Sequence, residues 1–135
     1  MSLRGFATYV SFDGGTTWRS NGLLPGYVPD YYANVTMAFD RDGAGYVCGW
    51  SGDRQYHPQL GGVRLWRSRD GGRTFERPVR AAKGFLDHPA LAADRSAGPA
   101  PPTLYLAGVA LPDGANIARV ITSHDRDASD GLDRA

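Results

Sequence analysis

One eight-residue segment occurs twice in this chain, at residues 11–18 and 68–75. The first copy reads Ser-Phe-Asp-Gly-Gly-Thr-Thr-Trp and the second reads Ser-Arg-Asp-Gly-Gly-Arg-Thr-Phe. Asp13 and Asp70 lie 57 positions apart, and a degraded third copy at 123–125 places Asp125 another 55 positions on. A supersecondary unit repeated at such a spacing is typical of β-propeller blades. We therefore expect a series of repeated units.

The segments between the turns have the length and composition of β-strands. Gly and Pro supply 18 and 9 of the 135 residues and divide the chain into apolar segments of about 5–9 residues. No long stretch has a helical period of apolar residues. We expect an all-β fold with strands at 5–12, 17–24, 35–40, 45–51, 62–69, 74–81, 88–94, 103–110 and 117–124.

These strands group into about two and a quarter four-stranded antiparallel blades of a β-propeller. The single segment 1–135 would hold a partial blade at 5–24, a full blade at 35–81, a partial blade at 88–125 and a polar tail at 126–135. A tandem β-sandwich is the competing interpretation, but it does not explain the same turn at the same strand. Partial blades leave strand edges unpaired. We therefore expect self-association that completes blades, either as a closed ring of three chains or by irregular strand exchange.

The repeated segment has a local physical reason. Asp-Gly-Gly predicts a tight turn, because Gly accepts positive φ and Asp can bind backbone N–H groups that follow it. The Ser and Thr hydroxyls complete this network, and the aromatic residue is expected to pack under the turn. The residues with these structural roles are Ser11, Asp13, Gly15, Thr17, Trp18, Ser68, Asp70, Gly72, Thr74 and Phe75.

The two segments resemble the Asp-box, or bacterial neuraminidase repeat (BNR repeat). This repeat occurs in sialidases, in other propeller glycoside hydrolases, and in non-enzymatic propellers such as sortilin. Phe-Asp-Arg-Asp-Gly at 39–43 and Asp-His-Pro-Ala-Leu-Ala at 87–92 are similar to bacterial exported sialidase-like proteins. The resemblance implies that the Asp-box lies on the face opposite the active site. Asp13 and Asp70 are then structural rather than catalytic.

Ligands are expected on the other face, at the connections 24–34, 51–61, 81–88 and 111–117. Aromatic, carboxylate and basic side chains in such loops could bind a sugar or a peptide, although loops are also polar because they face solvent. Asp30 and Asp113 lie in the same connections. The ligand-binding candidates are Tyr31, Tyr32, Asp53, Arg54, Tyr56, His57, Asp87 and His88.

The catalytic set of the sialidases does not carry over to this chain. That set comprises three Arg, a Tyr nucleophile with a Glu partner and an Asp acid/base. The chain has no Phe-Arg-Ile-Pro segment, and its single Glu, Glu76, follows Phe75 on an expected outer strand. We expect a non-catalytic binding or scaffold module for carbohydrate or protein, with catalytic residues unknown. The alternatives are a fragment of a propeller glycoside hydrolase, whose catalytic residues lie in missing blades, and a cofactor-free assembly factor.

The net charge and the counts of Cys and His limit which kinds of partner and cofactor we expect. A net charge of +1 gives no basis for a nucleic-acid partner, and no apolar run is long enough to span a membrane. Cys48 is alone and is expected to be a buried free thiol, and the three His lie on separate segments, so no metal or cofactor is expected. Asp-Arg-Asp-Gly at 40–43 predicts an ordinary turn rather than a calcium loop. The resemblance suggests an exported protein, whereas no signal peptide is expected at residues 1–6.

Overall fold

The computed structural model describes residues 5–26, 31–52, 61–83, 86–100, 102–110 and 117–123. Every regular element within these ranges is a β-strand, and every pairing between neighbouring strands is antiparallel. The expectation of an all-β fold is therefore confirmed. The described part of the chain contains no helix of the length and apolarity that crossing a membrane requires.

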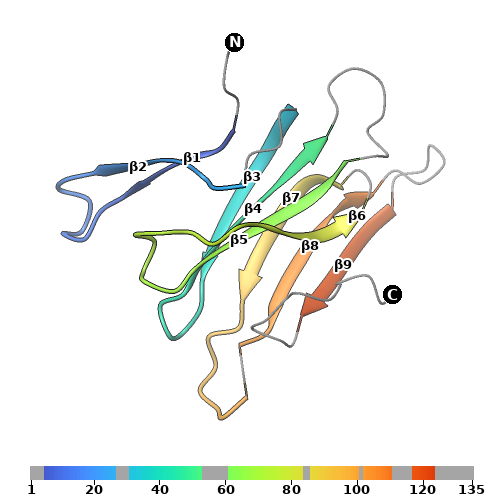
Figure 1. Ribbon diagram of the computed structural model, residues 1–135. Coiled ribbons are helices and arrows are strands. Elements are labelled where there is room, and N and C mark those ends of the chain that lie inside the picture. Colours follow the sequence, from blue (N-terminus) through green and yellow to red (C-terminus); the bar gives the residue numbers. More distant parts are fainter. Residues whose placement is uncertain are drawn as a thin grey trace.

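The described strands form three separate sheets, each made of strands consecutive in sequence (Figure 1). The first sheet pairs β1 (Ala7–Val10) with β2 (Arg19–Leu23). The second has the order β3 (Tyr31–Phe39), β4 (Gly45–Gly52), β5 (Gly62–Ser68) and β6 (Val79–Lys83). The third has the order β7 (Leu86–Ala93), β8 (Leu104–Ala110) and β9 (Ile117–Ser123).

Each of the nine expected strands overlaps an observed one, but two boundaries were wrong. A strand was expected over 74–81, whereas β6 begins only at Val79. The repeated turn extends to Glu76, whose N–H donates to the Arg67 carbonyl at 2.8 Å, and Pro78 has no N–H to offer a neighbouring strand. The strand expected at 35–40 begins earlier, at Tyr31. A bulge between Ala33 and Thr36 interrupts the two-residue alternation of its side chains, so the sequence pattern did not reveal the first part of the strand.

The main core lies between the second and third sheets. Its buried residues come from β4, β5 and β6 on one side and from β7 and β8 on the other: Tyr46, Cys48, Val63, Leu65, Ala81, Ala82, Leu86, Leu104 and Leu106. Alternate residues of one strand point to opposite faces of a sheet. Tyr46 and Cys48 therefore face this core, whereas Val47 faces the other side of the second sheet.

The β1–β2 hairpin packs on that other side. Leu24, which follows the hairpin, joins Val47 and Trp66 in a second buried cluster, with Phe6 and Phe75 packed against it. The Trp66 Nε1 donates to the Pro25 carbonyl at 2.8 Å, and the Phe6 and Trp66 rings meet edge to face at 5.9 Å. Strand β4 of the second sheet therefore has cover on both faces. This explains why β4 is buried continuously from Gly45 to Ser51.

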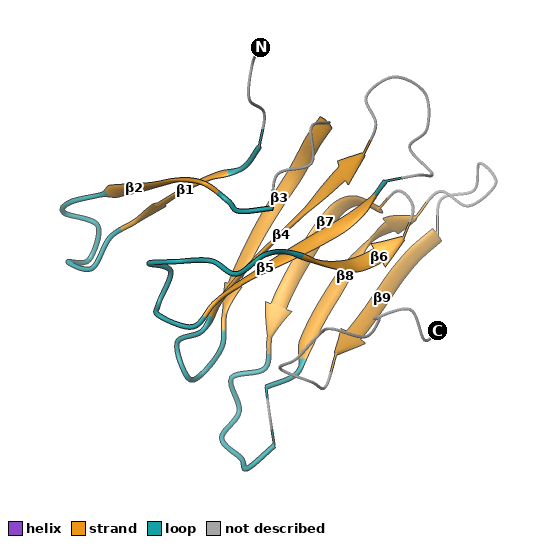
Figure 2. Cartoon of the chain, viewed as in Figure 1, coloured by secondary structure: helices purple, strands orange, loops and turns teal. Residues whose placement is uncertain are grey.

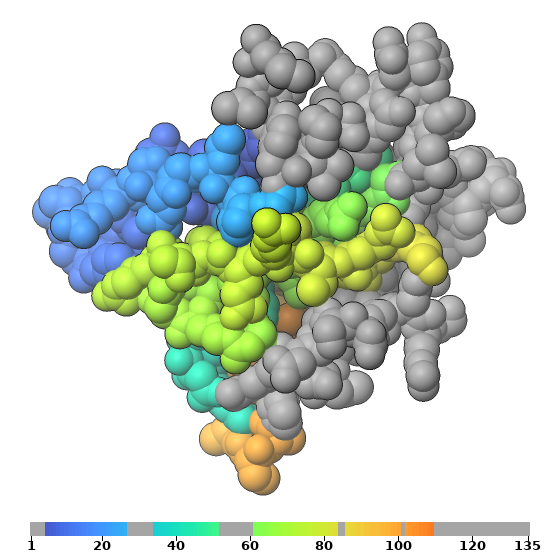
Figure 3. All heavy atoms as spheres, viewed as in Figure 1, coloured from blue at the N-terminus to red at the C-terminus, as the bar shows by residue number. Residues whose placement is uncertain are grey.

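The described turns within the sheets gather at one end of the strands, on the lower left in Figure 2. Neighbouring sheets are tied together there by hydrogen bonds. The Asn21 Nδ2 of β2 donates to the Gly72 carbonyl at 2.7 Å, and Figure 3 shows the hairpin beside this segment. The Arg41 guanidinium donates to the carbonyls of Ser96, Gly98 and Ala100 in the turn between β7 and β8.

Candidate functional site

The second repeated turn (residues 68–75) is closed by its own side chains. The Asp70 Oδ1 accepts the N–H groups of Arg73 and Thr74 at 2.9 Å and the Ser68 hydroxyl at 2.7 Å. The Thr74 hydroxyl donates to the Asp70 Oδ2 at 2.6 Å, and the Ser68 Oγ accepts the Gly72 N–H at 2.8 Å. The hydrogen-bond network expected for this turn is therefore confirmed.

The first repeated turn (residues 11–18) closes in the same way. The Thr17 N–H and hydroxyl donate to the two oxygens of Asp13 at 2.9 and 2.6 Å, and the Ser11 Oγ accepts the Gly15 N–H at 2.8 Å. Trp18 lies against its own turn, since its Nε1 donates to the Gly15 carbonyl at 3.0 Å, but the expected burial was wrong, because Trp18 is 64% exposed. Its counterpart Phe75 is half-buried, since it packs against the second buried cluster.

These hydrogen bonds keep both carboxylates charged. Donation from the Thr17 hydroxyl, the Thr17 N–H and the Ser11 hydroxyl lowers the pKa of Asp13 to about 2. The Thr74 hydroxyl, the Thr74 N–H and the Ser68 hydroxyl hold the pKa of Asp70 well below its usual range. A carboxylate held this strongly as an acceptor is a poor proton donor. The hydrogen bonds of Asp13 and Asp70 therefore close the two turns, which is a structural role.

Other charged groups at this end of the strands also have partners within the fold. The buried Asp40 accepts hydrogen bonds from the N–H groups of Asp42 and Ala44 and from the Tyr46 hydroxyl, so the segment 40–43 has ordinary turn geometry. The only Glu of the chain, Glu76, forms ion pairs with Arg67 and Arg69 at 3.1 and 2.6 Å.

At the opposite end, β3 and β7 each contain a bulge at the same place in their sheet. The register shifts between Ala33 and Thr36 in β3, and between Asp87 and Ala90 in β7. Asn34 and His88 lie in these bulges with φ of 57° and 47°, and they are the only positive-φ residues other than Gly in the described chain. Strained backbone of this kind is concentrated at functional sites.

The two bulges bring three polar side chains together. The Asn34 Nδ2 donates to the Asp87 Oδ1 at 2.8 Å, although the two residues are 53 positions apart. The Asp87 Oδ1 also accepts the His88 N–H at 3.0 Å, and the His88 Nε2 lies 3.6 Å from the Asp87 Oδ2. The His88 side chain is 82% exposed, so the imidazole is accessible to a ligand. We call these three residues the bulge cluster.

The bulge cluster contains two of the ligand-binding candidates, Asp87 and His88. Asn34 was missed, although aligning Asp40 with Asp94 and counting back six positions pairs Asn34 with His88. The backbones of Tyr31 and Tyr32 begin β3, three and two positions before Asn34. The remaining candidates lie outside the described residues: Asp53, Arg54, Tyr56 and His57, together with Asp30 and Asp113.

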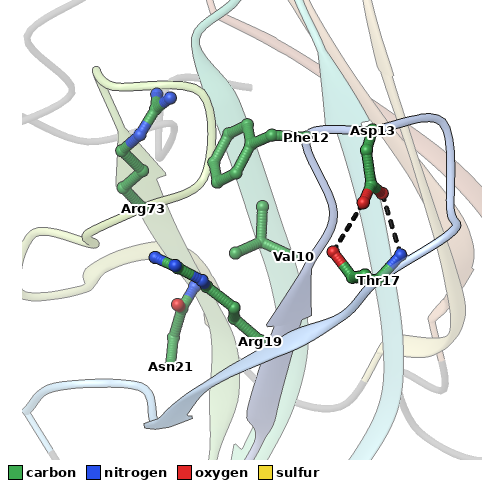
Figure 4. A pocket seen from close by; sticks show the side chains of 7 residues that line it. All are labelled: Val10, Phe12, Asp13, Thr17, Arg19, Asn21 and Arg73. Atoms are coloured by element: carbon green, nitrogen blue, oxygen red, sulfur yellow. Dashed lines mark hydrogen bonds between the residues drawn. The ribbon is translucent and has the colours of Figure 1, made fainter.

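A hollow that the sequence did not indicate lies beside the two repeated turns (Figure 4). Its volume is about 520 Å³. Arg19 of β2 and Arg73 of the second repeated turn both lie beside Val10 and Phe12, and the Arg73 guanidinium stacks 3.9 Å from the centre of the Phe12 ring. The residues that line it are Val10, Phe12, Asp13, Thr17, Arg19, Asn21 and Arg73. Two guanidinium groups beside an aromatic ring could receive an anionic group.

In the described part of the chain, the side chains that could bind a metal ion are scattered and the one thiol is buried. The His, Cys, Asp and Glu side chains of this part do not gather in any group of three that could hold a metal ion. Cys48 is a free thiol with no exposed surface, as expected, and burial raises its pKa to about 12. His57 and His124 lie outside the described residues.

A scan against protein-family models and a search of curated proteins found no match to this chain.

Proposed function

We propose that this chain is an Asp-box β-propeller segment that binds carbohydrate at the bulge cluster without hydrolysing it. The resemblance to sialidase-like propellers supplies the fold. The two repeated turns support it, because they close with the same hydrogen bonds in two neighbouring sheets. The blade organisation, with partial blades at 5–24 and 88–125 around a full blade at 35–81, belongs to the same proposal.

The observation that carries the binding role is the bulge cluster itself. A carboxylate accepts sugar hydroxyl protons, while an imidazole and an amide can donate to or accept from the same hydroxyls. The Asn34–Asp87 hydrogen bond fixes the carboxylate between two sheets, which pre-organises the site.

A binding role fits the cluster better than hydrolysis does. Sialidases depart from the usual two-carboxylate route and use a Tyr nucleophile with a Glu partner and an Asp acid/base. The only Glu of this chain, Glu76, is paired with Arg67 and Arg69 at the other end of the strands. The bulge cluster contributes one carboxyl group, from Asp87. The alternative function, a fragment of a propeller glycoside hydrolase, would require catalytic residues from further blades.

A glycan array and a fluorogenic sialoside assay test the proposal together. We expect retention of at least one glycan class and no release of the fluorophore. Asp87→Asn should abolish retention, because it removes the charge at nearly unchanged shape. His88→Gly should also abolish it, since Gly accepts the φ of 47° at that position and only the imidazole is lost.

Arg19→Ala is the matched control at the other end of the strands, where Arg19 lines the hollow beside the repeated turns. It should leave glycan retention unchanged. Retention that depends on Arg19 but not on Asp87 would move the ligand to the face of the repeated turns and refute the assignment. Release of the fluorophore by the purified chain would favour the hydrolase instead.

A further inference from the structure

One face of β3 carries apolar side chains that are largely exposed. Val35, Met37 and Phe39 alternate along the strand and are 57%, 55% and 40% exposed. A hollow of about 400 Å³ separates them from Tyr9 and Val10 of β1. We call Val35, Met37 and Phe39 the head face. Adjacent apolar side chains this exposed mark an interaction surface.

The third sheet has an uncovered face of a different kind. Ala90 and Ala92 of β7 are exposed, and Tyr105 of β8 lies opposite Ala92 in the strand register and is 42% exposed. Residues directly opposite each other on paired strands share one face. We call Ala90, Ala92 and Tyr105 the tail face. It combines small side chains on β7 with one large aromatic ring on β8.

The chain already contains a joint between two such faces. β3 packs on β7, and the Leu91 N–H donates to the Thr36 hydroxyl oxygen at 3.4 Å. Leu91 and Ala93 of β7 pack against the main core from one side, and Tyr46 of β4 is buried in it from the other. Ala38 lies opposite Tyr46 in the register, so it faces the third sheet as well.

The sequence repeat shows which residues of the head face and the tail face correspond to residues in the contact between β3 and β7. Met37 corresponds to Leu91, and Tyr46 corresponds to Tyr105, which follows the equivalent turn. Leu91 is half-buried in the joint whereas Met37 is 55% exposed, and Tyr46 is 4% exposed whereas Tyr105 is 42% exposed. The head face is thus an unused copy of the surface that β7 presents to β3. The tail face is an unused copy of the surface that β3 and β4 present to the third sheet.

We propose that a second copy of this chain docks head to tail, with the head face of one molecule on the tail face of the other. Large side chains at Met37 and Phe39 would lie over the small side chains of Ala90 and Ala92, in the same way that β7 packs on β3 within the chain. Such an interface joins two different surfaces, so it grows into a ring or a filament instead of stopping at a symmetric pair.

The proposed docking also determines which strand pairs with the open edge of β1. Among the described strands β1 pairs only with β2, whereas its counterpart β5 pairs on both edges. In the assembly, β8 of the second copy reaches the open edge of β1, and β9 must leave β8 to admit it. The β1–β2 hairpin stays in place, because the Trp66 and Asn21 hydrogen bonds hold it to the second sheet.

A mixing experiment tests this geometry by sedimentation velocity at micromolar concentrations. We expect concentration-dependent association of the parent chain. Met37→Glu blocks only the head face and Ala92→Glu only the tail face, and each alone should weaken association by about 100-fold or more, because a carboxylate would be desolvated. A one-to-one mixture of the two variants retains one intact head and one intact tail, so it should form a dimer and nothing larger.

Three further measurements keep the result interpretable. Circular dichroism establishes that both variants fold, as expected for substitutions at exposed positions. Ala97→Glu, an exposed position in the turn between β7 and β8, adds the same charge outside both faces and should associate like the parent chain. Amide exchange at β9 should accelerate on association. A parent chain that stays monomeric at all concentrations overturns the proposal, and so does a mixture that fails to dimerise.

Discussion

Trp66 joins the β1–β2 hairpin to the rest of the molecule, and its truncation tests the packing of the first two sheets. The side chain is 2% exposed, its Nε1 donates to the Pro25 carbonyl, and its ring meets Phe6 edge to face. Two substitutions separate these contributions. Trp66→Ala removes the ring and the hydrogen bond, whereas Trp66→Phe retains an aromatic ring and removes the donor.

The expected losses of unfolding free energy follow from the buried surface. A buried indole removes on the order of 200 Å² from water, which at about 25 cal/mol per Å² corresponds to about 5 kcal/mol. Measured Trp→Ala losses in cores are about 3–5 kcal/mol, so we expect a loss in that range for Trp66→Ala. Trp66→Phe should cost about 1–2 kcal/mol, because it loses one hydrogen bond and part of the packing.

Urea unfolding, at a protein concentration too low for self-association, measures these losses of free energy. Amide exchange then shows which strands are affected. Exchange should accelerate more in β1 and β2 than in β7 and β8, because Trp66 packs on the hairpin side of the second sheet and its loss adds local opening of the hairpin to the global destabilisation. Trp18→Ala is the matched control: Trp18 is 64% exposed and should cost under about 1 kcal/mol. Equal losses for Trp66→Ala and Trp18→Ala would refute the packing argument, as would uniform acceleration of exchange.

Three further outcomes are expected. Gly108→Ala should cost about 1–3 kcal/mol in urea unfolding, because a Cβ at that position would lie 2.5 Å from the Leu86 Cγ; an unchanged midpoint would contradict this close approach. The pKa values of Asp13 and Asp70 are lower in the folded state than in the unfolded chain, so the stability they contribute is complete above about pH 4 and is lost as the pH falls towards 2; thermal melts across this range should show a decline that Asp70→Ala reduces. Cys48 should react with a thiol reagent only in denaturant, and labelling of the native chain at the same rate would contradict its burial.

Local sequence signals predicted the strands and turns of this chain well. Gly and Asp mark the repeated turns, and short apolar segments mark the strands between them, since both signals act within a few residues. Boundaries were wrong where a non-repetitive feature intervened: Pro78 delays β6, and the bulge after Ala33 conceals the start of β3. A bulge breaks the alternation on which strand prediction depends.

The bulge cluster and the exposure of Trp18 depend on neighbouring sheets, which local patterns do not describe. Asp87 and His88 were predicted from their connection, but their contact with Asn34 crosses two sheets. Trp18 and Phe75 occupy the same position of the repeated segment, yet only Phe75 packs against a buried cluster. Sequence equivalence therefore predicts equal burial only where both copies have the same neighbours.

The two repeated turns have a consequence for folding kinetics. Their side-chain hydrogen bonds join residues no more than four positions apart, whereas the Asn34–Asp87 contact joins residues 53 positions apart. Closing a short loop costs little chain entropy, and hairpins form in about 1–10 μs. The β5–β6 hairpin should therefore be largely formed in the transition state, with φ-values near 1 around Asp70 and near 0 around Asp87. The rate of folding would then be governed by the docking of preformed sheets on one another.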